Sequence, residues 1–245
     1  MPSFLVTLGL AAAAAAISLA VRHVLGFGFS LTFVPLASFF LPTREAVLTA
    51  IVLEIVLGVP LAIELRRDLR LRDSTRLLAA SLLGIAVGIG ALRLLSQALL
   101  FKLSLVPLLA LAALLCARPA LSTSPSRAKL VAAGLLSGAM NVWASFSGPP
   151  VALYYLTTET STKSIKGLLT GYFLVLYLFT ACGLVLDGEY GSFEGWAVVL
   201  TAACTIAVLY PLSKSLARAA EPWFRKLAAW FLLLVAAAAL LKDFH

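Results

Sequence analysis

Charged residues are scarce in this 245-residue sequence: Asp, Glu, Lys and Arg together make up 12% of it, against 62% hydrophobic residues. A soluble domain needs a polar exterior, which this composition cannot supply. Histidine occurs only at His23 and His245, and no HExxH or GxSxG motif is present. The cysteines, Cys116, Cys182 and Cys204, stand singly in apolar runs without CxxC spacing. We therefore expect neither a metal site nor a cofactor, and the sequence does not indicate an enzyme.

Negative charge is the scarcer sign, with 11 Asp and Glu residues against 19 Lys and Arg residues and a net charge of +8. Basic proteins often bind nucleic acid, but here the positive residues gather in short loops between apolar runs. In that position they set the orientation of membrane helices. We therefore expect a lipid bilayer as the partner, and no nucleic acid. Met1–Ala20 lacks the positively charged start of a secretion signal, so we interpret it as a retained first helix.

The apolar residues form long runs, and about 20 residues of helix cross the ~30 Å hydrocarbon core. The runs cover residues 3–25, 28–41, 45–65, 77–95, 98–117, 129–146, 149–158, 165–186, 195–213 and 227–241. Most are long enough to span a membrane, but 149–158 is about half a span. The stretch 129–158 fits a hairpin that enters partway and returns, which is tolerated where irregular backbone lines a cavity. Whether 1–41 forms two crossings or a second hairpin stays open.

The positive residues divide unequally between the two sets of loops. One set holds Arg66, Arg67, Arg70, Arg72, Arg76, Arg118, Arg127, Lys129, Lys163, Lys166, Lys214, Arg218, Arg225 and Lys226. The other set holds only Arg44, Arg93, Lys102 and Lys242, with the acidic residues Asp187, Glu189 and Glu194. The positive-inside rule then places the first set in the cytoplasm. We expect a multi-pass protein of the bacterial inner membrane with both termini in the periplasm.

The chain also divides into two similar halves, 1–118 and 129–245, joined by a cytoplasmic linker at 119–128. Gly26-Phe-Gly-Phe-Ser30 precedes a short apolar run, a polar break and a long run, and Ser145-Phe-Ser-Gly-Pro149 does the same in the second half. Each half makes an odd number of crossings, so the two halves run in opposite directions. The predicted fold is all-α: a polytopic membrane protein of two inverted repeats with broken, re-entrant helices. This organisation is typical of secondary transporters.

In such transporters the substrate binds near the bilayer midplane, where the broken helices meet. Ser147 is suited to cap the helix that follows it, and Pro149 suits a first helical turn. Unpaired N–H groups and the positive end of the helix dipole would together form an anion site. The residues that we expect to bind substrate are Arg22, His23, Gly26, Gly28, Ser30, Asn141, Trp143, Ser145, Ser147, Gly148, Pro149 and Lys166. The alternative is that the small residues only let helices pack closely.

The charged candidates each have a second interpretation. Glu54 lies near the centre of its predicted helix, where a carboxylate is a candidate for proton or ion coupling, or is neutral and hydrogen-bonded to a neighbouring helix. Arg22 and His23 either face the cavity beside Gly26 or reach to the cytoplasmic interface. His23 titrates near neutrality and could link binding to pH. Lys166 either reaches the anion or anchors a cytoplasmic loop.

Several motifs resemble one transporter family. The second half contains Gly134-Leu-Leu-Ser-Gly138, then Ser145-Phe-Ser-Gly-Pro-Pro-Val-Ala-Leu-Tyr-Tyr155, then Lys166-Gly167. The first half contains Gly26-Phe-Gly-Phe-Ser30 through Pro35, then Glu45-Ala-Val-Leu-Thr49. These runs resemble the two repeats of the TauE/SafE family of sulfite and organosulfonate exporters over nearly the whole chain. The resemblance implies export of a sulfur-containing anion such as sulfite, sulfoacetate or a related sulfonate, with proton coupling as an option.

Three alternatives stay open at this stage. The cargo could be another organic anion, such as a carboxylate, and the direction could be uptake. From another class, the chain could be a membrane-embedded enzyme acting on a lipid-linked substrate. A homodimer is compatible with this architecture, although no sequence pattern indicates it.

Overall fold

The computed structural model describes residues 4–25, 28–64, 66, 74–117, 125–158, 162–219, 230, 233 and 237. All regular secondary structure in these ranges is α-helical, which confirms the predicted all-α class. The helices are α1 (Phe4–Leu25), α2 (Phe29–Ala37), α3 (Thr43–Glu64), α4 (Thr75–Leu94), α5 (Gln97–Ala117), α6 (Arg127–Ala144), α7 (Gly148–Thr158), α8 (Thr162–Leu186) and α9 (Trp196–Ala219). Gly26, linker residues 118–124 and most of the predicted run 227–241 lie outside the described residues.

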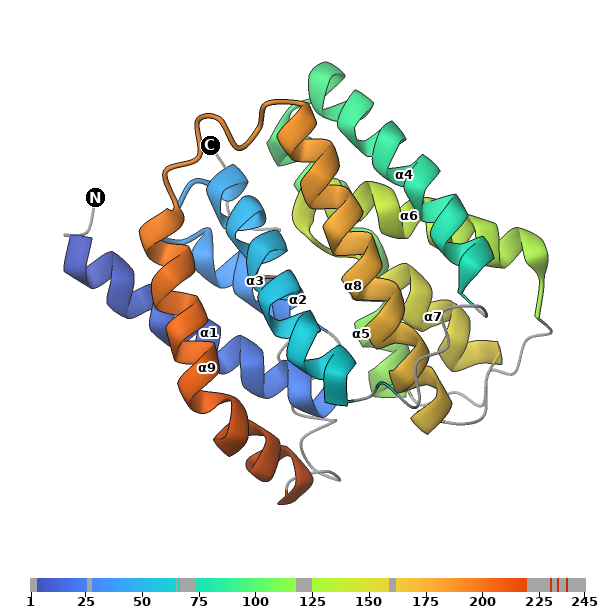
Figure 1. Ribbon diagram of the computed structural model, residues 1–245. Coiled ribbons are helices and arrows are strands. Elements are labelled where there is room, and N and C mark those ends of the chain that lie inside the picture. Colours follow the sequence, from blue (N-terminus) through green and yellow to red (C-terminus); the bar gives the residue numbers. More distant parts are fainter. Residues whose placement is uncertain are drawn as a thin grey trace.

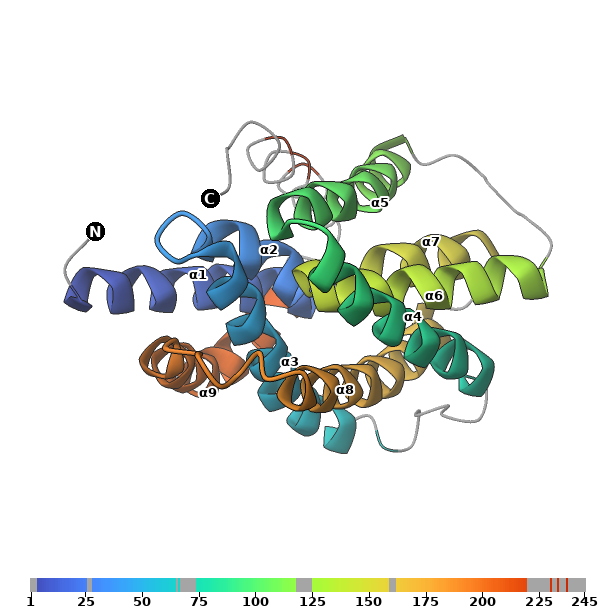
Figure 2. The ribbon, with the colours of Figure 1, turned by 90° about the horizontal axis from the view of Figure 1, so that it is seen from above.

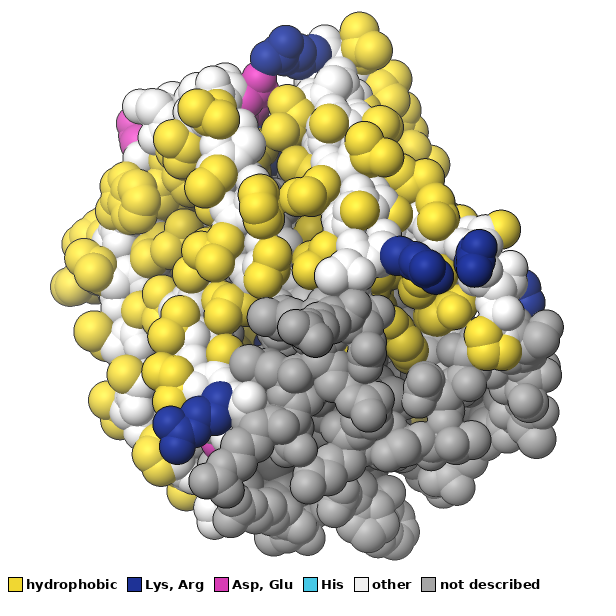
Figure 3. Space-filling view, turned by 45° about the vertical axis from the view of Figure 1, so that its right-hand side comes forward, with side chains coloured by type: hydrophobic (Ala, Val, Ile, Leu, Met, Phe, Trp, Pro, Cys, Tyr) yellow, Lys and Arg dark blue, Asp and Glu magenta, His cyan; other side chains and the backbone are white. Residues whose placement is uncertain are grey.

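Five stretches in the described part of the chain are long and apolar enough to cross a membrane. They are Phe4–His23, Thr43–Glu64, Thr75–Leu94, Leu168–Leu186 and Trp196–Ser213. Leu94 and Leu186 are 83% and 89% exposed, and hydrophobic side chains cover most of the described surface in Figure 3, with Lys and Arg at its margins. Such an apolar exterior suits lipid and not water. The chain is therefore a multi-pass helical membrane protein, as predicted.

Both predicted helix breaks are present. Between α1 and α2, Gly28 has a φ of 100°, a left-handed conformation that glycine adopts without steric cost. Between α6 and α7, Ser145 has a φ of 59°, and its backbone N–H donates to the carbonyl oxygen of Asn141 at 2.9 Å. A left-handed residue other than glycine costs about 1–2 kcal/mol and is held by its surroundings, often at functional sites. The chain thus stops being helical at the two matched places.

The helices that follow the breaks are short. α2 has nine residues and α7 has eleven. At ~1.5 Å per residue, neither covers much more than half of the hydrocarbon core. The described residues of the predicted 1–41 segment are therefore one long helix followed by a half-length helix, and not two complete crossings. In both views α2 turns back from the end of α1, and α7 turns back from the end of α6 (Figures 1 and 2).

Each broken unit rests on a helix from the other half of the chain. α1 packs on α9, α6 packs on α4, and α3 packs on α8 between them (Figures 1 and 2). The α4–α6 contact depends on glycine: a Cβ at Gly84 would lie 2.2 Å from the carbonyl oxygen of Leu135, and one at Gly138 would lie 2.1 Å from that of Ser81. Small residues let membrane helices approach this closely. Gly138 of the second-half motif is therefore a packing residue.

Candidate functional site

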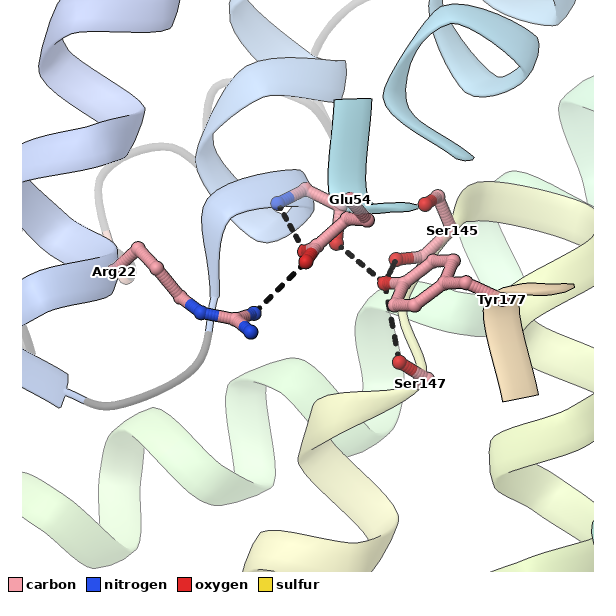
Figure 4. Close-up of polar contacts among 6 residues, drawn as sticks. Arg22, Glu54, Ser145, Ser147 and Tyr177 are labelled. Carbon is pink, nitrogen blue, oxygen red and sulfur yellow. Dashed lines mark hydrogen bonds and ion pairs between the residues drawn. The ribbon is translucent and has the colours of Figure 1, made fainter. Parts of the chain in front are cut away.

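Tyr177, in the middle of α8, joins the two helix breaks. Its hydroxyl donates to the carbonyl oxygen of Ser145 at 3.0 Å and accepts from the hydroxyl of Ser147 at 3.1 Å, both in the second break. It also shares a 3.0 Å hydrogen bond with the hydroxyl of Ser30, in the first turn of α2. Tyr177 is 1% exposed, so these contacts are made away from solvent and lipid. The breaks, 115 positions or more apart in sequence, therefore meet at one buried phenol (Figure 4).

On the other side of Ser30 lies a buried ion pair. The Arg22 guanidinium donates from Nη1 to Oε2 of Glu54 at 2.8 Å, and the two residues are 3% and 2% exposed. The second carboxylate oxygen of Glu54, Oε1, accepts from the backbone N–H of Ser30 at 3.2 Å. A charge buried at membrane depth is costly and persists where a partner and function retain it. Figure 4 shows Arg22 reaching Glu54 from one side while Tyr177 lies on the other.

The two helix starts differ in the donors that they offer. α2 begins with Phe29, Ser30, Leu31 and Thr32, all of which carry backbone N–H groups, and its N-cap has no side-chain hydrogen bond. α7 begins with Gly148-Pro-Pro, so two of its first-turn positions have no N–H to donate. The positive end of a helix dipole exists at both starts. Of the two helix starts, that of α2 is better suited to bind an anion, because Arg22 adds a full positive charge there.

Several polar side chains near the breaks hold a buried atom that has no hydrogen-bond partner. These atoms include Nε of Arg22, Oγ1 of Thr32, Oγ of Ser145 and Oδ1 of Asn141. Asn141 uses its other end, Nδ2, to donate to the hydroxyl of Thr180 at 2.8 Å. Unpartnered buried polar atoms are uncommon and call for a physical reason. A polar ligand between the breaks would supply the missing acceptor and donor.

Of the remaining predicted site residues, some lie at the two helix starts, some lie apart from this cluster, and some lie outside the described residues. The indole of Trp143 donates to the carbonyl oxygen of Gly88 at 3.0 Å, so it belongs to the α4–α6 contact. The ring of His23 contacts the hydroxyl of Ser213 and the ring of Tyr210 on α9, and so lies toward α9 instead of Glu54. Gly28 and Gly148 contribute backbone at the two helix starts, with Pro149 beside the second. Gly26 and the side chain of Lys166 lie outside the described residues.

A second polar chain extends from the break toward α4. The carbonyl oxygen of Ser147 accepts from the hydroxyl of Ser137 at 2.7 Å, and Ser137 accepts in turn from Tyr172 at 2.8 Å. The Tyr172 hydroxyl shares a 2.7 Å hydrogen bond with Ser81. Neither tyrosine was predicted from the sequence. The sequence signal that could have identified them is a tyrosine in the middle of a membrane span, because a buried phenol hydroxyl usually has a hydrogen-bond partner.

A group of contacts lies at the end of the bundle where α3 begins. Arg44 donates from Nε to Glu189 at 2.8 Å and from Nη1 to the carbonyl oxygen of Val142 at 3.2 Å, close to the second break. Arg93 pairs with Asp187. The Tyr190 hydroxyl donates to the carbonyl oxygen of Leu48 at 3.1 Å, and burial raises the pKa of that phenol, so it stays a donor well above neutral pH. These contacts tie the loop after α8 to the first half of the chain, and Arg44 also reaches the backbone near the second break.

No group of three or more His, Cys, Asp or Glu side chains in the described ranges is arranged to hold a metal ion. The described site instead combines one guanidinium, one carboxylate, several hydroxyls and two interrupted helices inside a membrane protein. Such a set is suited to bind and release a small anion, as membrane transporters do.

The comparisons agree with this class. The family model for the sulfite exporter TauE/SafE matches residues 10–239, nearly the whole chain. The chain belongs to this family, which confirms the resemblance seen in the sequence and places it among membrane transporters of sulfur-containing anions. A search of curated proteins gave no match. A search of solved structures gave none either.

Proposed function

We propose that this protein exports a small sulfur-containing anion, such as sulfite, sulfoacetate or a related sulfonate, across the inner membrane. The observation that carries the proposal is the meeting of both helix breaks at Tyr177, directly beside the buried Arg22–Glu54 pair. Membership of the sulfite exporter family supports the same cargo class.

The chemistry of the cluster suits such a cargo. A sulfonate or sulfite carries several oxygens that accept hydrogen bonds and a charge that a guanidinium and a helix start stabilise. The Ser30 backbone N–H belongs to the first break and the unpartnered Ser145 hydroxyl to the second, and Arg22 supplies the charge. A bound anion would thereby contact both halves, so its binding responds to their relative position.

We further propose that the halves 1–118 and 129–245 are inverted repeats that provide alternating access. The neighbour relations support this. Exchanging α1–α4 for α6–α9 turns the α4–α6 contact into α9–α1 and the α4–α8 contact into α9–α3, and all four contacts are present. The loop charges favour a cytoplasmic linker at 119–128 and periplasmic termini. Glu54 is our candidate for proton coupling, because it is the carboxylate next to the proposed anion position.

Flux into proteoliposomes tests the proposal, with sulfite, sulfoacetate and acetate as competing cargoes. Ser145→Ala is the informative variant, because the Ser145 hydroxyl has no partner whose loss would weaken the fold. Ser104→Ala is the matched control: Ser104 is equally buried but bonds only the carbonyl oxygen of Leu100 in its own helix. We expect Ser145→Ala to raise the half-saturating sulfite concentration about tenfold, the loss of one hydrogen bond to a charged ligand, and the control to match the wild type.

Other outcomes would replace parts of the proposal. Preference for acetate over both sulfur anions would assign the cargo to carboxylates. Uptake into inverted membrane vesicles, whose cytoplasmic face is outward, corresponds to export in the cell; flux only in right-side-out vesicles would make the protein an uptake permease. Absence of flux for all three anions would remove the transport proposal.

A further inference from the structure

The position expected for the substrate anion is taken by an anion of the protein itself. Glu54 offers two carboxylate oxygens, and each receives one donor of the site: Oε2 from the Arg22 guanidinium at 2.8 Å and Oε1 from the Ser30 N–H at 3.2 Å. This is the contact pattern of an oxyanion at a helix start beside an arginine. The carboxylate arrives from α3, while both donors come from elements flanking the first break.

We propose that Glu54 competes with the cargo for this position, so that a small monovalent oxyanion binds Arg22 and the Ser30 N–H only when Glu54 has taken up a proton and released them. The proposal rests on the proposed function, because it concerns the same site. It assigns Glu54 a specificity role as well as a coupling role.

Charge balance is the physical reason. Arg22 and ionised Glu54 together are neutral, and both are at most 3% exposed. Adding a monoanion to that pair would leave one uncompensated negative charge in a medium where a buried ion without a partner is strongly unfavourable. A proton on Glu54 restores neutrality: the O–H bond forms on the carboxylate, and the incoming oxyanion takes over the guanidinium. A dianion would keep the excess charge even then, so among the proposed cargoes the site favours those that are monovalent, and a dianion binds more weakly.

The unpartnered Nε of Arg22 favours a cargo that has more oxygens than a carboxylate. Nε of Arg22 is buried and without a partner while Nη1 is used by Glu54. A planar guanidinium presents Nε and a terminal nitrogen side by side to two oxygens of one ligand. Glu54 contacts the guanidinium through Nη1 and accepts from the Ser30 N–H with its other oxygen, so Nε stays unused. A tetrahedral or pyramidal oxyanion has the third oxygen needed to take all of these donors.

Glu54 is the proton acceptor of the site, because the described groups around it do not take up a proton in its place. Arg22 of α1 is permanently charged, and Tyr177 of α8 donates its proton to the Ser145 carbonyl. α2 carries no titratable side chain. On α9, which packs on α3, Tyr210 lies beside Glu64 at the far end of α3.

The other helices on α3 carry few charges in their described parts. α5 has Lys102 in its second turn, and α6 has Arg127 and Lys129 in its first turn, on the far side of that helix from its break. The ring of His23 is directed to α9. The expected consequence is that each monoanion moves together with one proton, and that the loaded carrier gains no net charge.

Proton uptake on binding tests this directly. Purified wild-type protein in weakly buffered detergent receives methanesulfonate, a permanent monoanion that releases no proton of its own, while an indicator dye follows pH and calorimetry follows binding. We expect about one proton taken up per anion bound, and an affinity that falls with rising pH by as much as about tenfold per unit, the limit for one linked proton. Sulfoacetate, a dianion at neutral pH, should bind more weakly than methanesulfonate.

Two variants sharpen the test. Glu54→Gln keeps the shape but has no charge, so we expect tighter binding at high pH, no pH dependence and no proton uptake. Glu64→Gln, the same change on the same helix at its exposed end, should behave like the wild type.

Anion binding by the wild type without proton uptake, or unchanged pH dependence in Glu54→Gln, would overturn the competition while leaving transport intact. Absence of methanesulfonate binding and of sulfite flux in every protein would overturn the proposed function and the competition together. The wild-type proton count decides even if Glu54→Gln fails to fold.

Discussion

Replacement of Tyr177 by phenylalanine distinguishes the effect of the hydrogen bonds that join the two helix breaks from the effect of the packing of the ring. The ring keeps its place, and only the hydroxyl that contacts Ser145, Ser147 and Ser30 is lost. A side-chain hydrogen bond between membrane helices contributes about 0.6 kcal/mol on average. Three such contacts give about 2 kcal/mol, and the Ser145 carbonyl oxygen loses its side-chain donor. We expect unfolding to become easier by about 2 kcal/mol, and anion affinity to fall about tenfold because the breaks lose their common tie.

The assay pairs denaturant unfolding in detergent with sulfite flux in proteoliposomes. Tyr172→Phe is the matched control, since Tyr172 is also fully buried on α8 and its hydroxyl also bonds serines, Ser137 and Ser81. Those partners join α8 to α6 and α4, so we expect a similar loss of stability with an unchanged half-saturating concentration. Wild-type affinity in Tyr177→Phe, or equal loss in both variants, would refute a specific role for Tyr177 at the site.

Two further changes test the packing and the contacts near the start of α3. Gly84→Ala should destabilise the protein by about 1–3 kcal/mol, because its Cβ would lie 2.2 Å from the Leu135 carbonyl oxygen, whereas Gly90→Ala on the same helix meets open space. Denaturant unfolding compares the two, and equal stabilities would contradict the close α4–α6 contact. Arg44→Gln removes the partly exposed ion pair with Glu189, worth roughly 1 kcal/mol or less. The variant also removes the hydrogen bond from Arg44 to the carbonyl oxygen of Val142. The part of the loss that comes from the ion pair should shrink in high salt, since salt screens exposed pairs; a loss of stability with no salt dependence at all would contradict a contribution from the pair.

The helix breaks could be predicted because their signals are local. Gly28 and the Gly-Pro-Pro run from Gly148 interrupt long apolar runs. The structure has non-helical backbone at both places. The extent of α2 could not be predicted, because the apolar run continues to Leu41 while the helix ends at Ala37. Hydropathy does not distinguish a helix from an apolar turn that leads into the next helix.

The composition of the site was predicted in part. Arg22 and Glu54 were both candidates, but their pairing depends on how α1 lies against α3, which no local pattern encodes. Trp143 was expected at the substrate and instead bonds the backbone of Gly88, because the rotation of α6 turns its indole toward α4. Tyr177 was missed, since its role depends on two breaks that meet only in the folded chain.

The most direct test of the anion site is a crystal structure with selenite, an analogue of sulfite whose selenium is located by anomalous scattering. We expect the selenium between the start of α2 and Ser145, with an oxygen within hydrogen-bonding distance of the Ser30 N–H and Arg22 no longer bound to Glu54. Selenium found only elsewhere, with the Arg22–Glu54 pair intact, would contradict the central claim that the two helix breaks form the anion site.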